Sequence, residues 1–348
     1  MIGLLTALLI ASPQREDPAP LKLVKVITGR LNPKSVVHNG NGLFFAQNMM
    51  YLHTIAVYDR SFKRVRTISD RITPAKYGYP QFSGNVQGGP VECAFSHGGK
   101  FAWVSNYQMY GADFKNPGND HCGGTGHHDR SFLYKIDTAT GHILAAALVG
   151  SVPKYVAITP DNRLALVTNW CSYDMSVVDT TTCKEIRRIK LGRFPRGIAI
   201  DSSSSTAYVA MLGGTDIGVI DLKTYKVNWI RHVGASPRHL CLDPDGKFLY
   251  ATLNGESSVA KIDVVARKLV RKRSTGNMPR SMVMTPDGKY LYIVNNGSDT
   301  LSRVRTSNLT VVQTVRTNHH PIGITYDAET KRVWVACYTT GLMVFQSQ

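Results

Sequence analysis

The chain has 348 residues, of which 43% are hydrophobic and 19% charged, with 30 Gly and 16 Pro. This composition excludes a disordered, collagen-like or coiled-coil chain and is typical of a globular, turn-rich protein. The 41 Lys and Arg residues outnumber the 24 Asp and Glu residues, and the formal net charge of +17 predicts attraction to anions. Most of the acids are Asp, which favours turns and argues against a mainly helical fold.

The N-terminus begins with an apolar run. Residues 2–11 are almost wholly apolar, and a charged, Pro-rich stretch follows to Pro20. This run is too short to span a bilayer, but it fits the apolar region of a secretory signal with Ala11 at a cleavage position. No Lys or Arg precedes it, which departs from the usual signal. We interpret residues 1–18 as a signal peptide and linker, and expect a periplasmic or secreted protein with no transmembrane segment in the mature chain. The alternative is a frayed apolar N-terminus on a cytosolic protein.

A repeat of 42 residues organises most of the chain. Prolines recur at this interval at Pro153, Pro195, Pro237, Pro279 and Pro321. Each opens a unit of four short apolar runs separated by turn residues, a pattern that predicts four antiparallel strands. Pro33 and Pro90 start two further units of the same kind, so the chain contains seven.

The last unit is incomplete. Pro321 to Gln348 is 14 residues shorter than the repeat, and residues 19–32 supply that length, with the apolar run 23–28 followed by Gly29. We therefore predict an all-β, seven-bladed β-propeller over residues 19–348, with four-stranded antiparallel blades. An N-terminal strand completes the C-terminal blade and closes the ring. An open solenoid or two sandwiches would not explain why the missing residues lie at the other end.

Two insertions interrupt the repeat, at about residues 70–89 and 107–130. The first lies between an outer strand and the next inner strand, and the second lies between strands two and three of the following blade. Both connections emerge on the same face of a propeller. Long loops on a rigid scaffold commonly carry binding residues, so we expect this face to be the functional one.

Five of the seven blade-start prolines are followed by a basic residue. We call these five residues the basic ring: Lys34, Lys154, Arg196, Arg238 and Arg280. If they surround the mouth of the central channel, they form a positive funnel that concentrates anions. The alternative is that they donate hydrogen bonds to carbonyl groups of neighbouring blades and stabilise the closed ring. Both roles can hold together.

Aromatic residues lie near the ends of second strands on the same face. They are Tyr51, Tyr107, Tyr110, Trp170, Tyr173 and Tyr338. Beside Lys and Arg, such rings can stack on sugars or nucleobases. The alternative for at least half of them is packing beneath the long loops.

Histidines are also concentrated there. His320 precedes a blade-start proline, and His121, His127 and His128 lie in the second insertion. Imidazoles that converge suit zinc or copper, but their spacing matches no metal motif, and loop histidines are often simply solvated. We keep these three as metal-ligand candidates only and assign no cofactor.

Two of the six cysteines are placed to form a disulfide. Cys122 lies in the second insertion and Cys171 lies in the equivalent loop of the next blade, so we expect a disulfide between them in an exported chain. The other four have positions typical of free thiols: Cys93, Cys183, Cys241 and Cys337.

Several strands and turns share short motifs. The segments 103–106, 166–169 and 292–295 read Trp-Val-Ser-Asn, Leu-Val-Thr-Asn and Tyr-Ile-Val-Asn, and Pro-Asp-Gly-Lys turns occupy 244–247 and 286–289. With these motifs the chain resembles the YVTN-repeat, YncE-like family of seven-bladed propellers. Two blades depart from the motif, with Met211 and Cys337 in place of Asn. The resemblance implies the fold strongly and the function weakly.

Three functions remain open. The first is a non-enzymatic, monomeric binding or scaffold protein whose basic, aromatic face holds an anionic small molecule, a glycan or an acidic protein. The second is a lyase or lactonase, because similar propellers include such enzymes; Glu92 and His239, each two residues after a blade-start proline, would act as acid and base. The third is nucleic-acid binding, which the charge permits but no motif supports.

Overall fold

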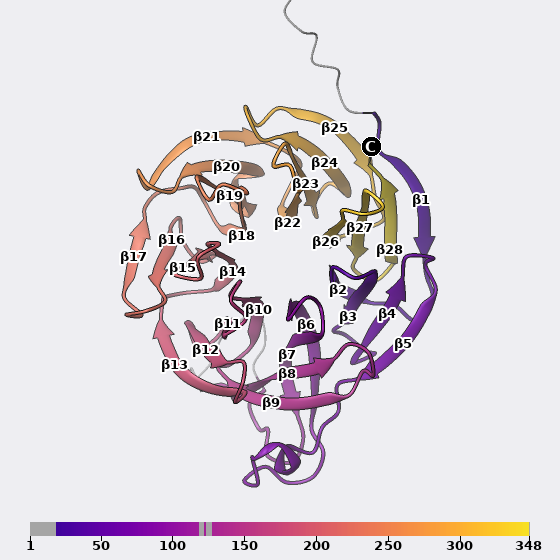
Figure 1. The fold of residues 1–348 in the computed structure, drawn as a ribbon, viewed down its shortest axis with the longest axis vertical. Coiled ribbons are helices and arrows are strands. Elements are labelled where there is room, and N and C mark those ends of the chain that lie inside the picture. The colour runs from indigo at the N-terminus through magenta and orange to yellow at the C-terminus, as the bar shows by residue number, and fades with distance from the viewer. Residues whose placement is uncertain (1–18, 118–121, 123–126, 348) are drawn as a thin grey trace, which may run out of the picture.

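The computed structural model describes residues 19–117, 122 and 127–347. Within these residues, seven four-stranded antiparallel sheets surround a central axis (Figure 1). The predicted seven-bladed β-propeller is therefore confirmed. Helical structure in the described residues is limited to two short 3-10 helices, η1 (Pro74–Tyr77) and η2 (Asn254–Glu256). No helix among them has the length and apolar character needed to cross a membrane.

The first four blades follow one another in chain order, each from its inner to its outer strand. Blade one contains β2 (Pro33–His38), β3 (Leu43–Asn48), β4 (Thr54–Asp59) and β5 (Arg64–Ser69). Blade two contains β6 (Gln87–Ser96), β7 (Phe101–Tyr110), β8 (Ser131–Asp137) and β9 (Ile143–Val149). Blade three contains β10 (Pro153–Ile158), β11 (Leu164–Asn169), β12 (Asp174–Asp179) and β13 (Lys184–Lys190). Blade four contains β14 (Pro195–Ile200), β15 (Thr206–Met211), β16 (Ile217–Asp221) and β17 (Val227–Ile230).

The last three blades repeat this order, and the seventh takes its outer strand from the N-terminus. Blade five contains β18 (Pro237–Leu242), β19 (Phe248–Leu253), β20 (Ser258–Asp263) and β21 (Lys268–Ser274). Blade six contains β22 (Pro279–Met284), β23 (Tyr290–Asn295), β24 (Thr300–Arg305) and β25 (Val311–Arg316). Blade seven contains β26 (Pro321–Asp327), β27 (Arg332–Cys337), β28 (Gly341–Gln346) and β1 (Lys22–Ile27).

The ring closes as predicted. β1 pairs antiparallel with β28, from Lys22 opposite Gln346 to Ile27 opposite Leu342. Apolar side chains fill the space between adjacent blades; at the closure, Phe44 of blade one stacks on Trp334 of blade seven with centroids 3.9 Å apart. β1 thereby pairs with the outer edge of β28, which would otherwise be exposed.

Each inner strand is irregular at its start. The pairing register with the second strand shifts directly after the blade-start proline in all seven blades, for example between Pro33 and Ser35. A proline donates no ladder hydrogen bond, and a β-bulge redirects the side chains beside it. The bulge therefore sets the direction of the residue that follows each proline, which is the position of the basic ring.

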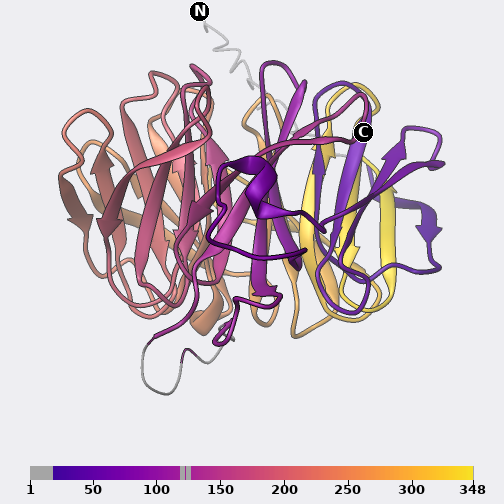
Figure 2. The same ribbon diagram turned by 90° about the horizontal axis from the view of Figure 1, so that it is seen from below.

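Both insertions begin and end on one face, which we call the mouth face. Gln87 at the start of β6 pairs with Tyr110 at the end of β7. The connection that enters β6 and the connection that leaves β7 therefore emerge on the same face. Figure 2 shows this face at the bottom. β6 and β7 each contain 10 residues and extend further than the repeat predicts. Among the described residues, the parts of the insertions outside the blade strands are therefore residues 70–86, 111–117, 122 and 127–130.

The first insertion turns away from the channel. Tyr77 donates its hydroxyl to the Ile143 carbonyl at 3.1 Å, and Tyr79 accepts from the Leu148 amide at 3.0 Å. This segment lies along β9, outside the ring (Figure 1). Its aromatic side chains gain buried contacts with Phe132, which explains why it leaves the mouth face instead of covering the channel as a loop.

Candidate functional site at the channel mouth

The five residues of the basic ring come from five blades and affect one another electrostatically. Lys34 is half-buried, and burial lowers the pKa of its ammonium group well below the ordinary value. The positive charges of the other four ring members lower this pKa further: Lys154, Arg196, Arg238 and Arg280. The geometry agrees for part of the ring, because Lys34 and Arg280 line one cavity and Arg196 contacts the backbone of Lys154.

Arg196 combines the two roles considered for the basic ring, which are to stabilise the closed ring and to supply positive charge at the channel mouth. Its side chain is 7% exposed, and its Nη1 donates a hydrogen bond to the backbone carbonyl of Lys154 in the neighbouring blade. This is the contact expected of a residue that stabilises the closed ring. The same guanidinium group contributes to the positive field at Lys34.

Hydroxyl groups fix the backbone of the ring. Thr168 Oγ1 donates to the Arg196 carbonyl at 2.7 Å, and Thr252 Oγ1 donates to the Arg280 carbonyl at 2.8 Å, each from one blade to the next. The ring residues are therefore held by the scaffold and not by mobile loops. Such preorganisation lowers the cost of binding a ligand.

Aromatic side chains accompany the cations. Lys154 Nζ lies 3.7 Å from the centroid of the Tyr107 ring and 5.6 Å from that of Trp170, and Lys34 Nζ lies 5.5 Å from that of Tyr338. These are cation–π distances. Trp170 also stacks on Phe194 at 4.5 Å, and Tyr173 packs edge-on against Phe194 at 5.6 Å. The contacts of Trp170 and Tyr173 with Phe194 fit the packing alternative.

A cavity of about 770 Å³ opens at the mouth, and we call it the mouth cavity. This volume lies within the range of small-molecule sites. Its charged and imidazole lining consists of Lys34, Arg280, His53 and His320. The remaining lining includes Met49, Met50, Tyr51, Tyr107, Gln108, Tyr110, Asn296 and Tyr338. Cationic, aromatic and thioether groups of this kind suit an anion that also carries a flat or apolar part.

A second, smaller space of about 210 Å³ lies where the inner strands continue beyond the ring, and we call it the inner cavity. Its polar lining includes Glu92, Tyr155, His239 and Ser281. The Tyr155 hydroxyl and His239 Nε2 are 3.0 Å apart and share a hydrogen bond. The candidate acid–base residues Glu92 and His239 therefore line one space.

Burial controls the protonation of both residues. It raises the pKa of Glu92 to about 7, against the opposing attraction of Arg196 and Lys34. It lowers the pKa of His239 to about 3, and the nearby positive charges of Arg196 and Arg238 lower it further. His239 is therefore a neutral imidazole near pH 7, and Glu92 titrates there.

The disulfide prediction is confirmed. Cys122 and Cys171 are joined, with Cα atoms 5.2 Å apart, and the other four cysteines are free. The bridge packs with Met49, Val91 and Tyr107 in one apolar cluster beside the mouth. It thus anchors the second insertion to blade three. A structural disulfide fits an oxidising compartment.

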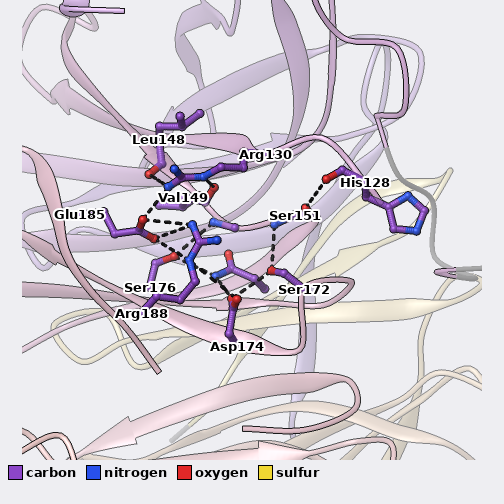
Figure 3. A network of polar contacts seen from close by, with 12 residues as sticks. His128, Arg130, Leu148, Val149, Ser151, Ser172, Asp174, Ser176, Glu185 and Arg188 are labelled. Atoms are coloured by element: carbon purple, nitrogen blue, oxygen red, sulfur yellow. Dashed lines mark hydrogen bonds and ion pairs between the residues drawn. The ribbon is translucent and has the colours of Figure 1, made fainter. Parts of the chain in front are cut away.

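A polar network holds the end of the same insertion (Figure 3). Arg130 donates to Glu185 at 2.5 Å and to the carbonyls of Leu148 and Val149 at 2.6 and 2.9 Å. Ser151 Oγ donates to the His128 carbonyl at 2.9 Å. The insertion is therefore fixed at two places, by the disulfide and by this network.

The metal-ligand candidates do not form a site in the described residues. His127 is exposed, the His128 backbone serves the network above, and His121 lies outside the described residues. Across residues 19–117, 122 and 127–347, no group of three or more His, Cys, Asp or Glu side chains could hold a metal ion.

Sequence reasoning missed several lining residues. Met49, Met50, Gln108 and Asn296 of the mouth cavity carry no signal beyond their place at second-strand ends. Tyr155 had a usable signal, because it stands two residues after a blade-start proline, as Glu92 and His239 do.

Comparisons with known proteins agree with the fold. A family model described as "Lactonase, 7-bladed beta-propeller" matches residues 219–317. The search of curated proteins finds no match. Among solved structures, Kuenenia stuttgartiensis hydrazine synthase is similar, with a TM-score of 0.73 and 19% identity over 92% of this chain and 97% of that chain. At this identity, the likeness shows the propeller fold alone.

Proposed function

We propose that the protein is a non-enzymatic binding propeller that holds an anionic small molecule, or an anionic group of a glycan or acidic protein, at the channel mouth. The observation that carries this proposal is that Lys34 and Arg280, from two blades, line the same cavity at the channel mouth. An anion at this position would interact favourably with the positive charges of the ring. The aromatic lining of the mouth cavity supports a ligand with a stacking surface.

Calorimetric titration with inorganic phosphate and with hexanoate tests the proposal. Lys34→Met removes a cation that lines the mouth cavity, and we expect it to weaken binding of both anions about tenfold. Lys268→Met is the matched control, because it removes the same charge from the exposed outer strand β21. Equal binding by the two variants would contradict a site at the mouth.

A lactonase or lyase is the second candidate. It is favoured by the presence of Glu92 and His239 in one inner cavity, and by the partial lactonase match. That match spans 219–317, so it includes His239 but not Glu92. Turnover of a sugar lactone by the wild type, lost in both Glu92→Gln and His239→Asn, would establish this candidate; no turnover would remove it.

We also propose that the chain is YncE-like, carries a signal peptide within residues 1–18, is periplasmic or secreted, and is monomeric. The disulfide between Cys122 and Cys171 supports an oxidising location. Nucleic acid remains a third candidate ligand that the charge of +17 permits.

A further inference from the structure

The inner cavity is lined by residues that directly follow, along the inner strands, residues lining the mouth cavity. Lys34, Arg280 and Ile322 line the mouth cavity, and Val36, Ser281 and Gly323, one or two residues later on the same strands, line the inner cavity. Two members of the basic ring, Lys34 and Arg280, therefore line the mouth cavity within one or two residues of the inner cavity. A ligand whose anionic group lies at the ring can extend its other end into the inner cavity.

The inner cavity is suited to an uncharged, mainly apolar group. Its apolar lining consists of Val36, Val37, Met282, Val283 and Ile324. The Tyr155 hydroxyl shares a hydrogen bond with the neutral His239 imidazole, and burial raises the pKa of the Cys241 thiol to about 12. Glu92 also lines this space, and burial raises the pKa of its carboxyl group to about 7, so this group is uncharged below that pH. A second negative charge on the ligand would lose its hydration here without gaining a counter-charge from these side chains.

The volume limits the size of that group. About 210 Å³ corresponds to about seven water molecules at their bulk volume, and a methylene group is of similar size. We propose that the channel binds a small amphiphilic anion, with one acidic head at the basic ring and a compact, uncharged tail of about seven carbon-sized groups in the inner cavity. This inference rests on the proposed function and specifies its ligand class.

Straight-chain carboxylates from acetate to decanoate test the inference by calorimetry on the full chain. Burial of each methylene group should strengthen binding about fourfold. The gain should stop near octanoate, when the inner cavity is full. Hexanol, which has a tail but no charge, should bind far more weakly than hexanoate.

Two variants locate the tail. Cys241→Phe and Val283→Phe each place a ring in the inner cavity, and both should abolish the gain with chain length while acetate binding persists. Leu144→Phe, on the exposed face of β9, is the control for non-specific apolar binding. Thermal melts identify a variant that fails to fold, and the chain-length series on the wild type tests the inference independently of both variants.

The outcomes separate the two proposals. Carboxylates that all bind with the same affinity would overturn the amphiphile inference and leave anion binding intact. Failure of every carboxylate and of phosphate to bind would overturn the proposed function itself. A chain-length gain that survives both channel variants and is lost in Leu144→Phe would place the tail outside the channel and contradict the inference.

Discussion

Cys122 and Cys171 join the second insertion of blade two to the β11–β12 connection of blade three, across 49 residues of sequence. The bridge lies in an apolar cluster with Tyr107, which also contacts the Lys154 ammonium group. A covalent contact between two blades therefore supports one side of the channel mouth.

Removing this bridge should destabilise the protein. We expect the double substitution Cys122→Ala/Cys171→Ala to lower the free energy of unfolding by about 2–4 kcal/mol, because the unfolded chain gains freedom. Urea unfolding monitored by tryptophan fluorescence measures this change. Cys183→Ala, at a buried free cysteine, is the control. Recovery of Cys122 and Cys171 as free thiols from the unreduced wild type would refute the bridge.

The polar network at Arg130 should also contribute to stability. Arg130→Met removes hydrogen bonds to Glu185 and to two backbone carbonyls, and we expect a loss of about 1–2 kcal/mol. Arg231→Met is the matched control, because the Arg231 side chain is largely exposed and its ion pair with Asp216 should be worth under about 1 kcal/mol. Equal effects in urea unfolding would mean that the network adds nothing beyond a surface ion pair.

Glu92 should make stability depend on pH. Burial raises its pKa in the folded protein to about 7, above the ordinary 4.5. The folded state therefore holds this proton more tightly, and the contribution of Glu92 to stability falls as pH rises from about 4.5 through about 7. Glu92→Gln, which cannot ionise, should match the wild-type melting temperature at pH 4 and exceed it at pH 8. A constant difference across this range would contradict the pKa assignment.

The same residue should affect ligand binding. Ionised Glu92 places a negative charge beside Arg196 and Lys34, where it competes with an anionic ligand. Anion affinity should therefore decrease as pH rises through about 7, and Glu92→Gln should remove this inflection. Calorimetric titration with hexanoate, in buffers that contain no phosphate, measures this affinity at each pH. An unchanged inflection in the variant would contradict the assignment of this titration to Glu92.

The 42-residue repeat made it possible to predict the fold from the sequence. Seven blade-start prolines located the inner strands, and the short last unit predicted that β1 would complete the ring. The disulfide followed from the same alignment of blades, because Cys122 and Cys171 occupy equivalent loops. These features depend on regular spacing, which the sequence displays directly.

Features set by packing outside the repeat were harder to predict. The first insertion was expected to decorate the mouth face, but its aromatic residues pack along β9 instead. Tyr155 and His239 occupy the same offset from a blade-start proline, but this spacing does not show that their side chains meet between blades three and five. The dual role of Arg196 likewise depends on a carbonyl group of the neighbouring blade.

Phosphate titration of two double variants tests the central claim most directly. Arg238→Gln/Arg280→Gln removes two charges from the basic ring, and Arg271→Gln/Arg273→Gln removes two from the exposed strand β21. The ring variant should lose at least about tenfold in affinity, or about 1.4 kcal/mol, while the control binds as the wild type does. Equal losses in both variants, which disappear together at higher salt, would show general attraction to the net charge and contradict a site at the channel mouth.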